Sequence, residues 1–393
     1  LHSPLTPRPH VIALRLQFPL CLLLLGSTAS APLLADGRHS DADAVIEVIG
    51  HYENGVGTSD AASQGYITRK LIEAKPLLRP AEVLEYVPGV IVTQHSSDGK
   101  ANQFFLRGFN LDHGTDFHTT VAGMPVNLPT HAHGQGYSDL NFMIPELIAR
   151  VDYKKGPYFA EEGDFSSAGA AHFHYLDRMK DNLASATAGG FGYRRVLLAG
   201  SPKRENGDLL YALELVNNDG PWVNPENFGK FNGVVRYGHG RKDDGYSITA
   251  MHYRGKWNAT DQIPQRAVDS GLVSRFGTID PTDGGESQRS SLSYDLRKPL
   301  LGGQFQMAAY FIKYRLQLYS NFSFFQDDPV NGDQFQQYDS RTVMGVAPNW
   351  LWTGKLGNVE SVVKVGMQLR HDNIDRVGLY NTAARQLLSI ARE

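Results

Sequence analysis

The chain has 393 residues, of which 41% are hydrophobic and 20% are charged, and its formal net charge is -3 at pH 7. This length allows one to three domains. A charge so close to neutral argues against nucleic-acid binding, which needs a basic face. The 40 glycines, 18 tyrosines and 19 phenylalanines favour many strands and turns over a helical bundle.

The first 35 residues have the pattern of an export signal. Arg8 and Arg15 precede an apolar run over 16–25, and small residues follow it up to Ala31. Such a pattern is typical of a secretory signal. We expect residues 1–35 to be this signal, with cleavage after Ala31 or Ala35. The alternative, a membrane anchor, would need an apolar run of about 20 residues, roughly twice the length found.

The only cysteine, Cys21, lies inside this apolar run. We therefore expect the exported chain to have no disulfide, no thiolate metal site and no cysteine nucleophile. No later stretch reaches the roughly eighteen consecutive apolar residues of a transmembrane helix, so any later membrane insertion would have to use strands.

A short β-prone run stands isolated within the polar segment 36–58. The run consists of Val45, Ile46, Glu47, Val48 and Ile49, followed by Gly50. One interpretation is the first strand of the next domain. The other is a strand that is free to pair with the sheet edge of another protein, because main-chain hydrogen bonds can supply the affinity.

Residues 59–175 have the pattern of a compact α+β domain. Apolar residues at helical spacing predict helices over 68–78 and 79–86. Pro88-Gly89 is expected to end the second helix. Strands are then predicted over 90–92, 104–109, 119–122 and 150–153.

After about residue 181 the pattern changes to long alternating segments separated by polar turns. Residues 209–215 and 305–319 alternate between apolar and polar side chains, and Tyr or Phe often stands near a segment end. A tight turn at 301–303 contrasts with a long polar loop at 259–286. These features are typical of a membrane β-barrel. A soluble β-sandwich also alternates, but its strands are usually about five or six residues long.

Several segments, in a fixed order, resemble motifs of the TonB-dependent receptor family. The run at 45–49 resembles the energy-coupling box that pairs with TonB. The other motifs belong to the family's plug domain: Ala81-Glu82-Val83-Leu84 with Val87-Pro88-Gly89-Val90, then Leu106-Arg107-Gly108-Phe109-Asn110, then Val121 to Val126 with Ala122 where Asp is usual, then Ile148 to Pro157, and finally Gly163 to Ala171.

This resemblance implies an α+β plug domain over 59–180, followed by an antiparallel transmembrane β-barrel over 181–393. Family barrels have 22 strands, and we expect about nine or ten in 181–393, which is fewer than half. We therefore expect the sequence to be a fragment or a truncated product. The implied location is the outer membrane of a Gram-negative cell, with lipid around the strands, the plug inside the barrel and 36–58 in the periplasm.

The resemblance also implies roles for individual residues. Residues 45–49 would bind TonB, the partner that transmits energy from the inner membrane. Arg107 is retained from the family pattern and is expected to face a barrel carboxylate. Lys155 replaces the usual Arg, which keeps the charge but loses the planar fork. We expect Arg107 and Lys155 to latch the plug to the barrel wall.

Histidines gather where the plug pattern places a loop that faces external solvent and ligand. Imidazoles with nearby carboxylates suit zinc or copper, so His131 and His133 are candidate metal ligands. The alternative is that the histidines form hydrogen bonds with an organic ligand. The residues expected to contact the ligand are His113, Asp116, His118, His131, His133 and Tyr137.

The family resemblance makes a receptor for a scarce nutrient the expected function. A ferric siderophore is the expected small-molecule cargo, because it is the family's commonest. TonB would supply the energy, so no cofactor is required, although a transition metal is possible as cargo. Three other interpretations stay open: a zinc or copper receptor, a non-transporting binding protein or passive pore, and a truncated inactive product.

An enzyme is not expected. His131 and His133 with Asp139 resemble the start of a metallohydrolase site, in which a metal lowers the pKa of bound water. However, the spacing to Asp139 matches no hydrolase signature that we recognise. The sequence also has no G-x-S-x-G or P-loop motif.

Overall fold

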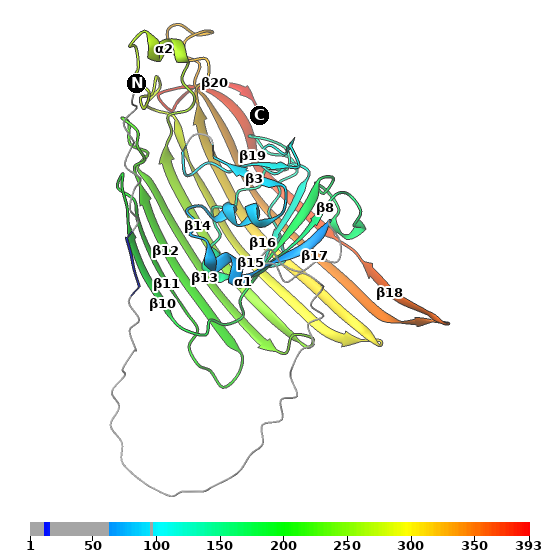
Figure 1. Ribbon diagram of the computed structural model, residues 1–393. Helices are drawn as coiled ribbons and strands as arrows, with labels where there is room; N and C mark the ends of the chain where they lie inside the picture. Colours follow the sequence, from blue (N-terminus) through cyan, green and yellow to red (C-terminus); the bar gives the residue numbers. More distant parts are fainter. Residues whose placement is uncertain (1–11, 16–62, 95–96) are drawn as a thin grey trace, which may run out of the picture.

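The computed structural model describes residues 12–15, 63–94 and 97–393. An α+β domain over 64–175 lies in front of a large antiparallel sheet (Figure 1). The first strand, β1 (Ile12–Arg15), pairs with β10 of the large sheet. The rest of the predicted export signal and all of 45–49 lie outside the described residues.

Two small sheets build the α+β domain. One has the order β2-β8-β9-β6-β7 and the other the order β3-β4-β5. All pairs are antiparallel except β6 with β9, which is parallel. The strands are β2 (Gln64–Thr68), β3 (Val90–Thr93), β4 (Gln103–Leu106), β5 (Phe109–Asn110), β6 (Phe117–Val121), β7 (Met124–Pro125), β8 (Ile148–Lys155) and β9 (Gly169–Tyr175).

The helices of this domain are shorter than the sequence predicted. The helix expected over 68–78 is α1 (Arg69–Ala74), and Lys75 is already extended because it precedes Pro76. The helix expected over 79–86 is a 3-10 helix, η1 (Pro80–Tyr86). Two single turns of 3-10 helix, η2 (Pro145–Leu147) and η3 (Ala160–Glu162), complete the set.

The strand predicted over 104–109 is two strands joined by a hairpin turn. Arg107 and Gly108 form the turn with φ of 52° and 84°, between the paired residues Leu106 and Phe109. A two-residue hairpin of this kind requires positive φ at both positions. Arginine rarely adopts such a conformation, which is why the sequence pattern did not predict the turn.

The large sheet has the order β1-β10-β11-β12-β13-β14-β15-β16-β17-β19-β20, and β18 also pairs with β17. It is an open sheet within the described residues, with β1 and β20 at its two edges. The strands are β10 (Leu183–Ala188), β11 (Arg194–Gly200), β12 (Asp208–Asn218), β13 (Phe228–Gly240), β14 (Gly245–Asn258), β15 (Gly284–Leu300), β16 (Gly303–Ser320), β17 (Phe335–Leu356), β18 (Val359–Gly366), β19 (Leu369–Ala383) and β20 (Gln386–Arg392).

Strands β18 and β19 form a single line along β17. The first pairs with Asn349–Leu356, and the second pairs with 335–346 of the same strand. If β18 and β19 are counted as one barrel strand, residues 183–392 contribute ten strands to the large sheet. That is fewer than half of the 22 in a family barrel.

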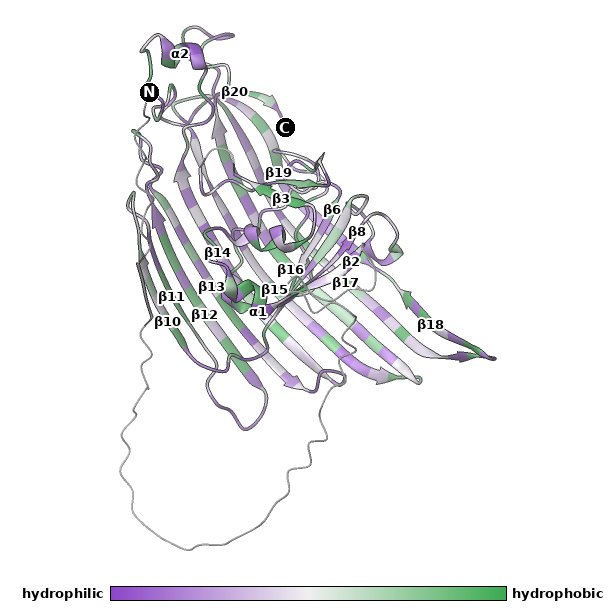
Figure 2. Cartoon of the chain, viewed as in Figure 1, coloured by the Kyte–Doolittle hydropathy of each residue, from purple (hydrophilic) through white to green (hydrophobic). Residues whose placement is uncertain are grey.

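Polar and apolar residues alternate along the strands of the large sheet (Figure 2). On β12, Leu213 and Leu215 are exposed, whereas Glu214 between them is 1% exposed. On β13, Val235 is exposed, whereas Asn232 and Arg236 are buried. The face turned away from the α+β domain is therefore rich in apolar residues, and the covered face carries polar groups. A lipid-facing barrel wall has this arrangement.

The two ends of the large sheet differ in their connections. At one end, two-residue turns at 301–302 and 357–358 join neighbouring strands. The opposite end carries longer loops at 219–227, 259–283 and 321–334, of which the second contains the short helix α2 (Gln265–Asp269). In the described part of the chain, no helix is long and apolar enough to cross a membrane.

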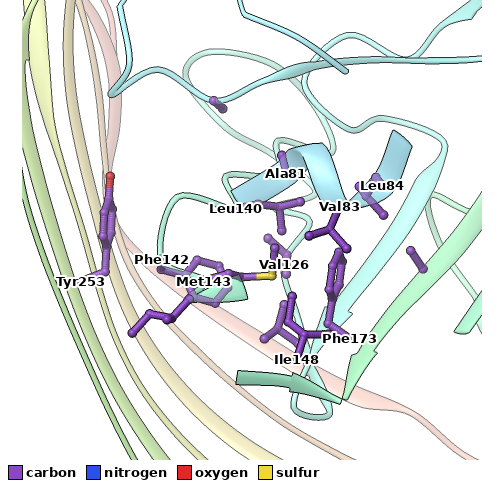
Figure 3. Close-up of a cluster of buried hydrophobic side chains, with 14 of the residues drawn as sticks. Ala81, Val83, Leu84, Val126, Leu140, Phe142, Met143, Ile148, Phe173 and Tyr253 are labelled. Carbon is purple, nitrogen blue, oxygen red and sulfur yellow. The ribbon is translucent and has the colours of Figure 1, made fainter. Parts of the chain in front are cut away.

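A buried apolar cluster fills the α+β domain and reaches the large sheet. Val83 and Leu84 of η1 pack with Ile148 and Phe173, and all four are at most 1% exposed (Figure 3). Phe142 and Met143 lie on the side of this cluster nearest the sheet strand that carries Tyr253 (Figure 3). The core is therefore continuous from the domain to the inner face of the sheet.

Candidate functional site

An arginine on the large sheet joins it to the α+β domain. The guanidinium of Arg195 on β11 donates to both carboxylate oxygens of Glu146, at 2.6 and 2.9 Å. It also donates to Glu214 on β12 at 2.7 Å, and Lys230 Nζ lies 2.9 Å from the same carboxylate. A bidentate contact fixes orientation as well as distance. Arg195 therefore anchors the η2 region to the inner face of the sheet.

A second contact holds the loop at 130–133 against β17. The guanidinium of Arg341 donates to the carbonyl of Thr130, and Gln337 Nε2 donates to the carbonyl of Ala132 at 2.9 Å. Arg341 also forms a fully buried ion pair with Asp339 at 2.6 Å. The sequence placed this loop on the side facing external solvent. His131 in this loop is 9% exposed, because β17 presents inward polar groups that bind the backbone of the loop. The side of the membrane that the loop faces stays a prediction.

Three of the predicted ligand-contacting histidines gather around Tyr137. The ring of His131 stacks on Tyr137 with centroids 4.1 Å apart, and its Nε2 lies 3.3 Å from Tyr314 Oη on β16. The rings of His113 and His133 lie 4.5 Å apart. His133 Nδ1 is 2.8 Å from Gln337 Oε1. The structure therefore brings these residues together, but as a junction between the α+β domain and the sheet.

His131 is fixed as a neutral imidazole. Burial holds its pKa well below the usual value of 6.5, and the charge of Arg341 lowers it further. Its Nδ1 accepts a hydrogen bond from the backbone N–H of His133 at 3.1 Å. The ring proton therefore resides on Nε2, which donates to Tyr314 Oη. Both ring nitrogens are engaged in contacts within the protein.

The candidate metal pair lacks the remaining ligands of a metal site. Zinc sites in proteins take three or four protein ligands. Among the residues that the structure describes, no group of three or more His, Cys, Asp or Glu side chains is placed to hold a metal ion. With both ring nitrogens of His131 engaged, His131 and His133 do not form a metal site in this arrangement of the described loop.

A second histidine cluster surrounds Glu162. His118 Nδ1 and His172 Nε2 lie 3.2 and 2.8 Å from the same carboxylate oxygen, and Lys154 donates to the other oxygen at 2.6 Å. Burial alone would raise the pKa of Glu162, but the hydrogen bonds from the two histidines and Lys154 hold it well below its usual value. His118 therefore helps to fix η3 against β6 and β9.

Asp116 also has a local structural role. Its carboxylate accepts a hydrogen bond from Ser167 Oγ, and its carbonyl accepts from the backbone N–H groups of Ala168 and Gly169 at 2.9 and 3.2 Å. These bonds hold the start of β9. The assignment of Asp116 and His118 as ligand contacts stays a prediction.

The predicted latch residues lie near one another. Arg107 is exposed on the β4–β5 turn, and Lys155 is 6% exposed at the end of β8. Burial lowers the pKa of Lys155, and the charge of Arg107 lowers it further. Neither side chain forms an ion pair with another residue of the described segments. Their role as a latch stays a prediction.

The sequence did not single out the charged residues that actually join the two parts. Glu146, Glu214 and Arg341 are conspicuous only once the strands are aligned. A partial signal was present, since Glu214 interrupts an apolar run between Leu213 and Leu215. A charge at such a position indicates an inward face that is polar.

Known proteins share both the domain and the fold. Residues 58–170 match the TonB-dependent receptor plug domain. The chain is similar in structure to the unliganded ferric citrate transporter FecA, with a TM-score of 0.64, 15% identity, and coverage of 84% of this chain and 50% of that chain. It is also similar to the copper transporter OprC, with a TM-score of 0.59, 17% identity, and coverage of 86% and 50%.

A third similar structure is the pyoverdine outer membrane receptor FpvA from Pseudomonas aeruginosa PAO1, with a TM-score of 0.60, 14% identity, and coverage of 86% of this chain and 54% of that chain. The chain thus spans about half the length of these structures. At these identities the likeness concerns the fold. With the plug match, it leads to one conclusion: residues 58–170 form a TonB-dependent receptor plug domain, and the chain shares the fold of these transporters and receptors over about half their length.

Proposed function

We propose that this chain is part of an outer-membrane receptor that imports a scarce nutrient by TonB-dependent transport. The observation that carries the proposal is the plug domain, bound in part by charged groups to the inner face of a sheet whose other face is rich in apolar residues. An apolar outer face suits contact with lipid. In a closed barrel, of which the large sheet would be part of the wall, the plug fills the enclosed space, so passage of the nutrient depends on moving the plug.

The contacts between the plug and the large sheet show which interactions must break before the plug can move. Displacing the plug breaks the Arg195–Glu146 pair and the hydrogen bonds that hold 130–133 to β17. The Arg195–Glu146 pair is partly buried, with side chains 17% and 32% exposed, so breaking it costs less than breaking a fully buried pair. The work comes from outside the chain: TonB pairs with residues 45–49 by strand addition and pulls. Energy supplied in this way needs no nucleotide-binding site on the receptor.

A ferric siderophore or a similar iron chelate is the proposed cargo. Similar structures include a ferric citrate transporter and a receptor bound to pyoverdine. The similarity covers most of this chain but about half of those proteins. Their cargo therefore supports a class of ligand for this receptor, and the choice within that class belongs to loops that vary between relatives.

A transition metal, free or chelated, is the second candidate cargo. It is favoured by the gathering of His113, His131 and His133 around Tyr137 and by the likeness to a copper transporter. To bind metal, His131 would have to exchange its contact with Tyr314 or with the His133 backbone. Metal capture would therefore accompany movement of the 130–133 loop.

Deletion of Val45–Ile49 tests the proposed transport. The experiment uses the protein as produced from its gene in outer membranes, and it measures binding and uptake of an iron chelate separately. We expect the deletion to abolish uptake and to leave binding unchanged. The matched control deletes Asp36–Ser40, five residues of the same segment outside the β-prone run, and should transport normally. Unimpaired uptake after loss of 45–49 would refute the proposal.

The two cargoes are separated by a double substitution. Replacing His131 and His133 with Ala, and titrating the protein with zinc or copper, should abolish metal binding if the metal is the cargo. His239→Ala, a distant exposed histidine, is the control. Unchanged metal affinity in the double variant eliminates the metal interpretation.

A further inference from the structure

The long loops at one end of the sheet are joined into a single unit, here named the loop cap (219–227, 259–283 and 321–334). The backbone N–H of Val223 donates to the carbonyl of Phe276 at 2.9 Å, and Asn224 Nδ2 donates to the carbonyl of Pro281 at 3.2 Å. Asn321 Nδ2 donates to Asp280 at 2.9 Å. A shift of one of these loops therefore strains its contacts with the others.

A lysine of the plug is embedded in this cap. Lys100 lies in the tip loop of the plug (residues 97–102), and its Nζ is 3.1 Å from Asp261 Oδ1. The side chains of Lys100 and Asp261 are 2% and 0% exposed. The same ammonium lies 5.6 Å from the centre of the Phe322 ring, in another loop of the cap. The pair is the only ion pair between the tip loop and the cap within the described residues.

The rest of the tip loop fits the same surroundings. The backbone N–H of Asp98 donates to Glu226 at 3.0 Å, and its carboxylate accepts from Asn218 Nδ2 at 2.6 Å. Gly99 packs directly on the indole of Trp257 at the end of β14. Together with the contacts of Lys100, the tip loop therefore contacts all three loops of the cap and the ends of β12 and β14.

The ion pair of Lys100 places a positive charge among acidic residues of the loop cap. Asp261 and Asp280 lie close enough to Asp283 for their charges to interact. Burial and these two neighbouring carboxylates raise the pKa of Asp283 to about 9. If the tip loop withdraws, the cap loses a positive charge from a group of three acidic residues. The buried Asp261 carboxylate then lacks its counter-charge, and the cap loosens.

We propose that the Lys100–Asp261 ion pair couples the plug to the loop cap, so that displacing the plug and rearranging the outer loops are one linked step. The proposal rests on the proposed transport function and adds its regulation. Coupling of this kind is reciprocal. A ligand that moves the 259–283 loop would loosen the tip of the plug, and withdrawal of the plug would loosen the loop.

The experiment measures hydrogen exchange of the tip loop and of 259–283 separately, in the protein as produced in outer membranes. The variants are Lys100→Met, Asp261→Asn and the double variant. Because breaking a buried pair exposes both segments to local opening, each single variant should speed exchange by at least about tenfold in both segments. The double variant should add little to either single one, since the partners act as a unit.

A matched pair that does not involve the plug is the control. Arg254 and Glu286 lie 3.0 Å apart on neighbouring strands, and Arg254 is more than half exposed. Arg254→Met should leave exchange in both segments unchanged. Faster exchange confined to the mutated segment would overturn the coupling. Lys100→Arg keeps the charge and should leave exchange in both segments unchanged. If Lys100→Met fails to fold, the comparison uses Lys100→Arg and Asp261→Asn. The readout does not use uptake, so it is independent of the 45–49 deletion.

Discussion

The close contact between Gly99 and Trp257 leaves no room for a side chain. A Cβ at Gly99 would stand 2.0 Å from Trp257 Cε3. We predict that Gly99→Ala destabilises the plug by about 1–3 kcal/mol, the usual cost of overpacking. Gly229→Ala is the control, because its nearest atom would be 3.7 Å away. Thermal unfolding of both variants measures the difference, and equal midpoints would contradict the predicted contact.

Glu226 makes the contact with the tip loop depend on pH. Burial, with the charge of Asp98, raises its pKa from 4.5 to about 7. Arg79 and the hydrogen bonds from Asp98 and Trp222 oppose this shift. The raised pKa means that the protonated form stabilises the fold. This stability is fully present below pH 4.5 and is lost as the pH rises through about 7.

Glu226→Gln should remove this pH dependence. The variant and the unmodified protein should have similar unfolding midpoints near about pH 4, and the variant should be more stable near about pH 8, by on the order of 2 kcal/mol. Asp219→Asn, a change in the same loop, provides the control. A constant difference across this range would show that Glu226 does not carry the shift.

Single residues also show where sequence reasoning ends. The histidines and Tyr137 could be selected from the sequence because their types are unusual in a plug loop. Their burial could not be predicted from the sequence, since His131 is covered by Tyr314 and Asp339, which lie more than 180 residues later. The residue types show which side chains could contact a ligand or a metal. Only the register of distant strands decides what covers them.

At the scale of elements, the turn between β15 and β16 carries a residue in an unfavourable conformation. Leu301 has φ of 50° and is 84% exposed, and Gly302 follows with φ of 71°. Asn-Gly is the preferred pair in such turns. We predict that Leu301→Asn stabilises the protein by about 0.5–1 kcal/mol in denaturant unfolding. Leu300→Asn, which lies in the extended strand, should give no gain. A loss of stability in Leu301→Asn would contradict this account of the turn.

Regular alternation made the strands of the large sheet predictable. The segments expected at 209–215 and 305–319 lie within β12 and β16, and the tight turn at 301–303 is confirmed. Two hairpin turns were harder to predict from the sequence, because they hold the non-glycine residues Arg107, Ala384 and Arg385 at positive φ. Local preference disfavours these conformations, and the paired strands impose them.

At the scale of the whole molecule, three of the contacts described above hold the plug to different parts of the large sheet. Arg195 binds Glu146, β17 binds the 130–133 loop, and the loop cap binds the tip loop. The family motifs predicted the plug, and the alternation of apolar and polar residues predicted the strands of the large sheet. The three contacts join residues that are far apart in the sequence, so no local pattern predicts them.

Cross-linking the plug to the wall tests the central claim, that cargo passes only when the plug leaves its place. Glu146→Cys and Arg195→Cys place thiols on two residues whose native side chains meet at 2.6 Å, and the only native cysteine is Cys21, in the predicted signal. A short bifunctional thiol reagent, added to outer membranes, should join the two. Uptake of an iron chelate is then measured against the untreated double variant. We predict that the joined protein binds the chelate and does not import it. Undiminished uptake at full cross-linking would contradict the account.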